Sequence, residues 1–330
     1  MEVAFTEWIP ITDESSVGEA RRRALLVAQR IGFDQTRSGE LALLATESSR
    51  NVLLHGRGGE TVILGMQAQG KSLARILAMD NGPGIANLAQ AMTDGYSTAG
   101  TMGAGMGAMQ RMATSMEVFT GKKGTVLLLE LGESSPPGSL RIAGMAVPHP
   151  GERFCGDAWA CHETPERSLI LLADGLGHGR DAAEAAQEAT AAFHKRQDHA
   201  PAEILGYVHD ALKKTRGAVA AIAEIRPIEA TLSYAGVGNI SAAVLTAAGS
   251  RSLVSHNGTL GMVTSRIQEF RIPWTPDALL VLHSDGLQSK WDLSAYPGLI
   301  TRHPAVIGGT LVRDFRRQRD DASVVVVKAA

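Results

Sequence analysis

The stretch that most constrains this chain is LLADGLGHGRDAAEAAQ, residues 171–187. A strand-like apolar run ends at Asp174, three glycines follow within the next five residues, and an alanine-rich helical pattern begins after them. Glycine permits the backbone conformations that so sharp a turn requires. A second glycine-rich turn, GTMGAGMGAMQ at residues 100–110, also leads into a helix. Such turns often hold phosphate at a helix N-terminus, so we ask whether both do, or whether the chemistry of the first lies in Asp174.

The two turns fall in different halves of the chain. With 330 residues, the chain is longer than one core usually accommodates, which predicts two domains. The segment GESSPPGS at residues 132–139 separates two strand-like runs, and its paired prolines favour neither strand nor helix. We therefore expect a first domain at residues 1–133, a linker at 134–139 and a second domain at 140–330. Helices and strands are segregated rather than strictly alternating, which predicts an α+β fold class.

Composition excludes several classes of protein. A formal charge of -2 leaves no basic footprint for nucleic acid and no polybasic anchor for a membrane surface. The start, MEVAFTEWIPIT, lacks the basic region of a signal peptide, and no apolar run approaches the roughly 20 residues that span a bilayer. Only Cys155 and Cys161 occur, so a disulfide framework is excluded. We expect a cytoplasmic protein whose cysteines are packing residues.

Polar residues and glycines recur through the first half in a fixed order. Glu47 and Asn51 lie four residues apart in a predicted helix at 36–55 and therefore share a face. A strand ends in Asp80, which can accept a hydrogen bond from an exocyclic amine, and glycines after it let backbone approach a flat base. Backbone N–H groups of the later glycine-rich loop suit anionic phosphates. These glycines, and the Thr that opens the closing strand, are Gly82, Gly84, Gly103, Gly105, Gly107 and Thr125.

Together these segments resemble the GHKL (Bergerat) ATP-binding domain over about residues 10–131, most closely the RsbT branch of bacterial switch-protein serine kinases. The resemblance implies an α/β sandwich that binds ATP with Mg²⁺, with Glu47 as general base and Asn51 as Mg²⁺ ligand. It places Asp80 on adenine, with Thr125 helping through water, and the loop at residues 97–107, the ATP lid, around the phosphates. The lid departs from the family pattern at Thr101 and Gly107. The ATP-binding residues implied are Asn51, Asp80, Gly82, Gly84, Ser97, Thr98, Gly103, Gly105, Gly107 and Thr125.

Two other kinase classes are disfavoured. The chain has no G-x-x-x-x-G-K-[ST] motif, which argues against a P-loop enzyme. The only histidine before residue 135 is His55, just beyond the Glu47–Asn51 pair, and no helix presents a phosphoacceptor histidine. We interpret His55 as a structural residue at a helix end.

Acidic residues mark the ends of strands or turns in the second half. Asp157 and Asp174 each adjoin a glycine, Asp285 follows the run LLVLHS, and Asp320 and Asp321 precede the strand ASVVVVKA. Carboxylates at the rim of a sheet are hard oxygen ligands that suit Mg²⁺ or Mn²⁺. A zinc site is disfavoured because the two cysteines lack clustered histidines. We assign no chemistry to the turn that holds Gly236, Gly238 and Asn239.

This pattern resembles the PPM-type serine/threonine phosphatases, in particular the SpoIIE-like branch that includes RsbX, over about residues 140–328. The resemblance implies an α-β-β-α sandwich with two Mn²⁺ or Mg²⁺ ions, which activate a water for attack on phosphoserine or phosphothreonine. Asp174 would bridge the metals with help from the Gly175 carbonyl, Asp285 and Asp320 would complete one site, and Asp157 would hold the other. The place of Asp320 in the motif favours it over Asp321, but both stay open.

Two further side chains near these acids have alternative roles. Arg153 is a candidate phosphate ligand or a surface residue, and His178 is a candidate acid for the leaving group or a structural turn residue. In neither case does the sequence require the catalytic role.

The sequence thus predicts a bifunctional regulator of a bacterial partner-switching pathway. A serine/threonine kinase would be fused to a phosphatase, both acting on STAS-domain antagonist proteins, with a sigma factor or another regulator downstream. In the alternative, the first half is a nucleotide-binding module that sequesters or activates a partner, and only the second half is catalytic. For the glycine-rich turn at 174–179, the sequence predicts that it binds no nucleotide and that it presents Asp174 to metal.

Overall fold

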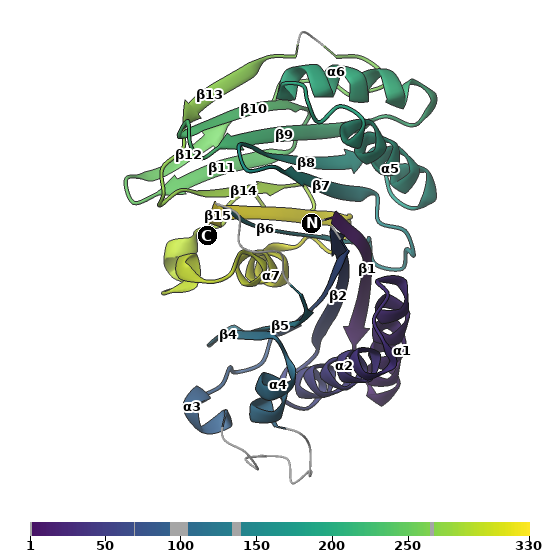
Figure 1. Ribbon diagram of the computed structural model, residues 1–330, viewed down its shortest axis with the longest axis vertical. Helices are drawn as coiled ribbons and strands as arrows, with labels where there is room; N and C mark the ends of the chain where they lie inside the picture. The colour runs from purple at the N-terminus through teal and green to yellow at the C-terminus, as the bar shows by residue number, and fades with distance from the viewer. Residues whose placement is uncertain (1, 69, 93–104, 134–139, 265–266) are drawn as a thin grey trace. The chain divides into compact units, whose positions relative to one another are not determined.

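The computed structural model describes residues 2–68, 70–92, 105–133, 140–264 and 267–330. The predicted linker at 134–139 and the lid residues Ser97, Thr98 and Gly103 lie outside these ranges. The chain forms two compact units, of which the first comprises Met1–Pro136 together with Thr301–Arg313. The second comprises Pro137–Ile300 and Asp314–Ala330. Both units are α+β, as the sequence predicts (Figure 1).

The first unit is built on one antiparallel sheet with strand order β1-β2-β3-β5-β4. Neighbouring strands pair antiparallel, with one register shift between Val3 and Phe5 of β1, and Gly59 of β2 lies opposite Asp80 of β3. This pairing places the end of β3 beside the start of β2. The strands are β1 (Glu2–Ile11), β2 (Gly59–Ala68), β3 (Lys71–Asp80), β4 (Ser115–Gly121) and β5 (Gly124–Gly132).

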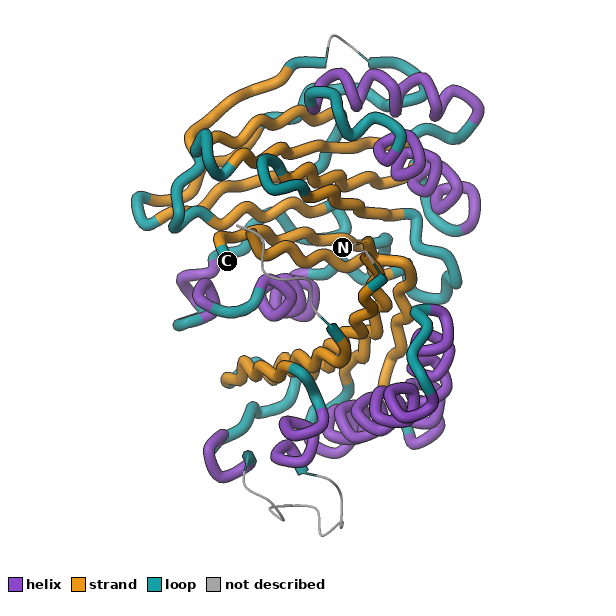
Figure 2. The backbone as a smooth tube through the Cα atoms, viewed as in Figure 1, coloured by secondary structure: helices purple, strands orange, loops and turns teal. Residues whose placement is uncertain are grey.

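Two long helices, α1 (Glu14–Arg30) and α2 (Gln35–His55), cover one face of this sheet (Figure 2). Asp13 caps α1 through the Ser16 N–H, and Asp34 caps α2 through the Arg37 N–H, so both helices begin where their first backbone donors are satisfied. A buried hydrogen bond of 2.9 Å between the Ser49 and Thr61 hydroxyls ties α2 to β2. The shorter α3 (Leu88–Ala91) and α4 (Met106–Met112) follow β3.

A third helix, α7 (Pro304–Phe315), contacts the opposite face of the same sheet through residues that belong to the first unit. A Cβ atom at Gly309 would lie 3.2 Å from both the Met79 sulfur and a Val126 methyl. No helix is predicted here from the sequence, and the segment combines two adjacent glycines with β-branched residues of low helix propensity. Burial of the whole stretch from Pro304 to Val312 outweighs that propensity.

The second unit contains two five-stranded sheets, with orders β13-β10-β9-β8-β7 and β12-β11-β14-β15-β6. Apolar side chains of both sheets form one core, and α5 (Arg180–His194) and α6 (Pro201–Ala211) pack on the first sheet through a second core. Short 3₁₀ turns occur at Leu212–Lys214, Leu293–Ala295 and Leu299–Thr301. The strands are β6 (Leu140–Val147), β7 (Asp157–Glu163), β8 (Ser168–Gly175), β9 (Ala218–Arg226), β10 (Thr231–Val237), β11 (Ser241–Thr246), β12 (Gly249–Leu253), β13 (Glu269–Pro273), β14 (Leu279–His283) and β15 (Ala322–Ala329).

Within the described ranges, none of the helices is both long and apolar enough to cross a bilayer.

Candidate nucleotide pocket and metal centre

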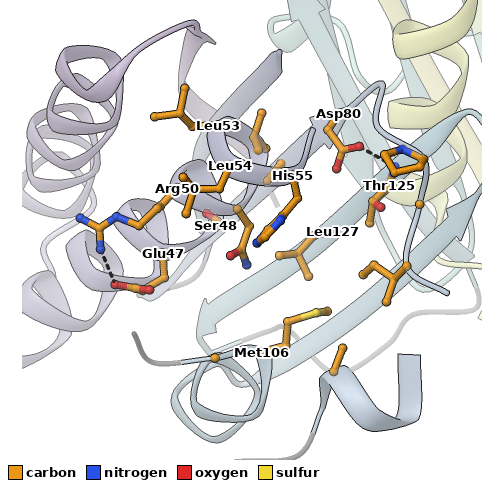
Figure 3. Close-up of a pocket in the computed structure, with 18 of the residues that line it drawn as sticks. Glu47, Ser48, Arg50, Leu53, Leu54, His55, Asp80, Met106, Thr125 and Leu127 are labelled. Carbon is orange, nitrogen blue, oxygen red and sulfur yellow. Dashed lines mark hydrogen bonds and ion pairs between the residues drawn. The ribbon is translucent and has the colours of Figure 1, made fainter. Parts of the chain in front are cut away.

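A cavity of about 700 Å³ opens in the first unit between α2 and the ends of β3 and β5 (Figure 3). Such a volume is typical of small-molecule sites. Gly82 and Gly107 do not line the cavity, although their neighbours in the sequence, Pro83 and Met106, do. The structure brings together most of the described residues that the sequence assigns to ATP, and those that line the cavity are Glu47, Asn51, Asp80, Gly84, Gly105 and Thr125.

The Asp80 carboxylate is held in place by backbone donors. Its Oδ1 accepts hydrogen bonds from the Gly82 N–H at 2.8 Å and from the Thr125 N–H at 3.1 Å. Gly124 makes this arrangement possible, since it has a φ of 122° and a Cβ there would lie 1.9 Å from the Asp80 carbonyl oxygen. These two hydrogen bonds give the Asp80 carboxylate a fixed orientation at the end of β3.

Gly82 and Gly84, the two glycines after Asp80, pack closely against backbone carbonyl groups. A Cβ at Gly82 would lie 2.4 Å from the His55 carbonyl oxygen, and one at Gly84 would lie 2.3 Å from the Gly121 carbonyl oxygen. Both residues must therefore be glycine for the turn to pack against the end of α2 and against the β4–β5 turn. This packing reason is independent of the close approach to a base that the sequence suggests.

Glu47 and Asn51 both reach the cavity from α2, as their spacing predicts. Arg50 lies between them and pairs with the Glu47 carboxylate at 3.4 Å, an interaction drawn in Figure 3. Arg50 is not among the predicted site residues, although its spacing of three residues from Glu47 on a helix indicates such a pair. His55 ends α2 and also lines the cavity.

In the second unit, the two sheets each bring acidic residues to a strand end. Asp157 at the start of β7 lies directly opposite Asp174 near the end of β8. Directly opposed residues of antiparallel strands have their Cβ atoms about 5 Å apart. Asp285 follows β14, and Asp320 and Asp321 precede β15, which pairs with β14. The structure therefore gathers the acids into two groups, each at the end of one strand pair.

Burial and mutual repulsion perturb these carboxylates strongly. Burial raises the pKa of Asp157 to about 7 against the opposing effect of the nearby Ser284 and Ser323 hydroxyls, and the weaker effects of the Asp321 and Asp320 charges also raise it. Burial also raises the pKa of Asp174 to about 9, with further contributions from Asp157, Asp285, Asp320 and Asp321. Because every acid of the set raises the pKa of Asp174, the two groups lie close enough to form one electrostatic centre.

Asp320 and Asp321 differ in what they face. The Asp321 side chain is buried, and its Oδ1 accepts the His149 N–H at 2.8 Å. Asp320 is the carboxylate that raises the pKa of Asp285, after the larger effect of burial. The charge of Asp320 therefore acts on Asp285, while Asp321 is hydrogen-bonded to the segment that precedes β7.

The chemistry of this centre fits a divalent cation. In the described part of the chain, both carboxylate oxygens of the buried Asp157 and the Oδ2 of Asp321 have no hydrogen-bond partner. Buried oxygens of this kind are costly unless a cation or a proton compensates them. No three His, Cys, Asp or Glu side chains among the described residues converge closely enough to enclose an ion by themselves. Ligands from waters and backbone carbonyls would therefore have to complete the coordination, as is usual for Mg²⁺.

The turn of residues 174–179 has the geometry that its glycines predict. Gly177 and Gly179 adopt φ values of 84° and 79°, which side chains disfavour, and α5 starts immediately after them. A Cβ at Gly175 would lie 2.1 Å from the Ala182 carbonyl oxygen, so β8 and α5 approach too closely for any other residue. The glycines thus position Asp174 at the end of β8.

Asn239, to which the sequence assigns no chemistry, contacts one of the candidate metal ligands. It follows β10, and its side-chain N–H donates to the Asp285 Oδ2 at 2.8 Å. Its position after a buried strand at a turn is the same signal that identified the acids. His178 stacks on His149 with ring centroids 4.6 Å apart, and its Nδ1 lies 2.9 Å from Glu152. Burial and the nearby Asp157 charge raise the pKa of the Cys155 thiol, as expected for a packing residue rather than a nucleophile.

These two sites define a two-domain protein in which an ATPase-like unit is joined to a unit with a PP2C-like fold and a cluster of buried acidic residues. The chain belongs to the family described as Stage II sporulation protein E (SpoIIE), whose model matches residues 164–330. A second family model, the histidine kinase-like ATPase domain, matches residues 9–131. The predicted fusion is therefore confirmed at the level of both families.

Individual relatives agree with this assignment. The serine/threonine-protein kinase RsbT of Bacillus subtilis (strain 168) is 32% identical over 104 residues, which cover 32% of this chain and 78% of RsbT. A structure from work on the bacterial stressosome is 27% identical with a TM-score of 0.55, and the match covers 57% of this chain and 99% of that one. RsbX in complex with magnesium shares the fold at 18% identity and a TM-score of 0.54, over 66% of this chain and 100% of RsbX. The chain thus combines a PP2C-type phosphatase domain with an RsbT-like kinase domain.

Proposed function

We propose that this chain sets the phosphorylation state of a STAS-domain protein by phosphorylating it with one domain and dephosphorylating it with the other. The kinase would comprise residues 1–133 and the phosphatase residues 140–330, with the segment between them as linker. Similarity to RsbT and to the SpoIIE family supports this pairing of activities. Joined in one polypeptide, the two activities would act on one partner or on two linked partners of a partner-switching pathway.

On the kinase side, Asp80 would accept the adenine amine, since its carboxylate is already oriented by two backbone donors. Asn51 would hold the Mg²⁺ of ATP, and Glu47, one helical turn away, would accept the proton of the substrate hydroxyl. Gly105 lines the cavity beside α4 and would face the phosphates. Ser97, Thr98, Gly103 and Gly107 remain predicted lid residues.

On the phosphatase side, the observation that carries the proposal is the buried Asp157, with both oxygens unpartnered among the described residues, directly opposite Asp174. Asp174 and the Gly175 carbonyl, with Asp157, Asp285 and Asp320, would hold two Mg²⁺ or Mn²⁺ ions. When bound, such ions supply an activated water and neutralise charge on the phosphoryl group. Asn239 would orient the Asp285 carboxylate through its hydrogen bond.

Two variants of the full chain separate the two activities. Asp174→Asn should transfer labelled phosphate from ATP to a STAS protein and leave it there, because removal is blocked. Glu47→Gln should release phosphate from a pre-phosphorylated STAS protein with Mn²⁺ but transfer none. Asp210→Asn, an exposed aspartate on α6, is the matched control and should retain both activities. Unchanged hydrolysis of a generic phosphoester by Asp174→Asn would refute the metal assignment.

One observation favours a second candidate for the first unit, a nucleotide-binding module without kinase activity. The Arg50 guanidinium lies 3.4 Å from the Glu47 carboxylate and would compete with a substrate hydroxyl for that oxygen. The same assay decides between the two, because a pure binding module retains nucleotide but transfers no label. Arg50→Ala tests the competition directly, since transfer should rise if Arg50 restrains the base.

A further inference from the structure

Two large apolar side chains of the second unit are exposed at one turn. Met262 is 63% exposed and Val263 is 79% exposed, at the tip of the turn formed by residues 259–263. A single exposed apolar residue is common in soluble proteins and needs no explanation. This pair is informative because the turn is fixed in place and lies beside the acidic centre of the same unit.

The turn is anchored to both a strand and a helix. The buried Leu260 exchanges two backbone hydrogen bonds with Ala218 at the start of β9, of 2.8 and 3.1 Å, and its side chain belongs to the core beneath α5 and α6. The Gly261 N–H donates to the Nδ1 of His209 on α6 at 3.2 Å. The turn therefore cannot fold back to bury its own tip, which stays exposed unless another molecule covers it.

The turn lies next to the end of β8 that carries Asp174. The Met262 Cγ lies 3.2 Å from the position of a Cβ at Gly217, the residue before β9. The Gly217 carbonyl oxygen in turn accepts the Leu176 N–H at 3.1 Å. Leu176 is exposed and follows Asp174 by two residues, so their Cα atoms lie within about 8 Å of each other. The three side chains of Leu176, Met262 and Val263, here called the flanking surface, therefore adjoin the acidic centre.

A positive charge borders the flanking surface. One guanidinium nitrogen of Arg216 lies 3.1 Å from the position of a Cβ at Gly177, the residue after Leu176. The Arg216 Nε lies 3.6 Å from the Asp181 carboxylate, and both side chains are largely exposed. An exposed ion pair of this length contributes little free energy, so Arg216 is available to an anion of a bound chain. An apolar surface with a basic edge suits a segment that carries phosphoserine next to apolar residues.

We propose that the flanking surface binds apolar side chains on either side of the phosphoserine in the protein substrate, with Arg216 attracting the anionic segment. This inference rests on the proposed phosphatase function, because the phosphoryl group at the acidic centre fixes where the substrate chain passes. An extended chain rises about 3.3 Å per residue, so residues about one to three positions from the phosphoserine reach Leu176 and Met262. The phosphatase then selects its substrate by sequence around the phosphoserine as well as by the phosphate.

The test uses the full chain with Mn²⁺ and two synthetic phosphoserine peptides, which carry either leucine or glycine at the second and third positions on both sides. We expect kcat/KM to be about tenfold higher for the leucine peptide, chiefly through a lower KM, because one or two apolar side chains become partly buried. The double variant Met262→Ser, Val263→Ser should reduce this preference to within about twofold. Ile228→Ser is the matched control and should retain it, since Ile228 is 82% exposed but follows the other end of β9. Equal kcat/KM for the two peptides in the wild-type chain would overturn the proposal.

A second measurement does not depend on turnover. In protein labelled with ¹³C at the methionine methyls, the Met262 signal is identified by its loss in Met262→Ser, and it should shift on titration with the leucine peptide but not with the glycine peptide. Absence of p-nitrophenyl phosphate hydrolysis with Mn²⁺ contradicts the proposed phosphatase function, whereas an unchanged Met262 signal overturns the flanking surface alone. A Met262 signal that shifts with protein concentration in the absence of peptide identifies a second copy of the chain as the occupant and also overturns the proposal.

Discussion

Asp157→Asn tests the electrostatic interpretation of the acidic centre most directly. In metal-free protein the Asp157 carboxylate is 4% exposed, has no hydrogen-bond partner among the described residues and lies opposite Asp174. Ionisation of this group should therefore destabilise the folded state unless a cation binds. Removing the charge should stabilise the metal-free protein and abolish its stabilisation by Mn²⁺.

The magnitude follows from the pKa. Burial raises the pKa of Asp157 from its ordinary value of 3.8 to about 7, so the folded state binds the proton more tightly than the unfolded state does. Stability is therefore lost as the pH rises from about 4 through 7, and the full shift corresponds to about 4 kcal/mol. The buried Asn amide would itself lack partners, at a cost of about 1–3 kcal/mol. We expect a net gain of about 2 kcal/mol at pH 8.

Urea unfolding in EDTA at pH 8 and pH 5, followed by tryptophan fluorescence, measures this difference. Three of the four tryptophans, Trp159, Trp274 and Trp291, lie in the second unit and report on its unfolding. The gain should shrink towards zero or reverse at pH 5, where wild-type Asp157 is protonated, and Asp210→Asn should show no gain at either pH. If Asp157→Asn is the less stable protein at pH 8 in EDTA, the carboxylate is not an uncompensated buried charge and the reasoning is wrong.

Three other outcomes are expected. Asn239→Ala should raise the Mn²⁺ concentration for half-maximal phosphatase activity about tenfold, because the Asp285 carboxylate loses its orienting partner. Isothermal titration should show Mn²⁺ affinity falling about tenfold per pH unit between pH 8 and 7, with protons released on binding, since the pKa of Asp174 is raised to about 9. Gly124→Ala should destabilise the first unit by about 3 kcal/mol, measured by hydrogen exchange of β3 and β5, because its φ is 122° and its Cβ would meet the Asp80 carbonyl.

The sequence predicts the first unit well because its signals are local. Alternating or continuous apolar runs mark β3 and β5, and the spacing of Glu47 and Asn51 places both on one face of α2, where the structure finds them beside the cavity. The position of Asp157 opposite Asp174 is not predicted by such local signals. It depends on the register of β7 against β8, which the residues at 157–163 do not reveal, since they mix apolar and polar types.

Helix α7 is not predicted from the sequence for a related reason. Its segment, PAVIGGTLVRDF, contains the adjacent Gly308 and Gly309 and several β-branched residues, all of low intrinsic helix propensity. What makes it helical is a sheet face more than 170 residues earlier in the chain, and Gly309 is small because Met79 and Val126 lie against it. The hydrogen bond from Asn239 to Asp285 likewise depends on the ends of β10 and β14 meeting in space, which the sequence does not reveal.

The location of α7 also bears on whether the chain can be cut into two parts that each fold alone. A cut within residues 134–139 separates the two halves of the sequence, but the first unit includes Thr301–Arg313 from beyond that cut. A fragment ending at residue 133 would carry a sheet whose face at Leu77, Met79 and Val126 has lost its covering helix and presents apolar surface to water. The two halves of the nicked chain should therefore stay associated, and each expressed alone should be prone to aggregate.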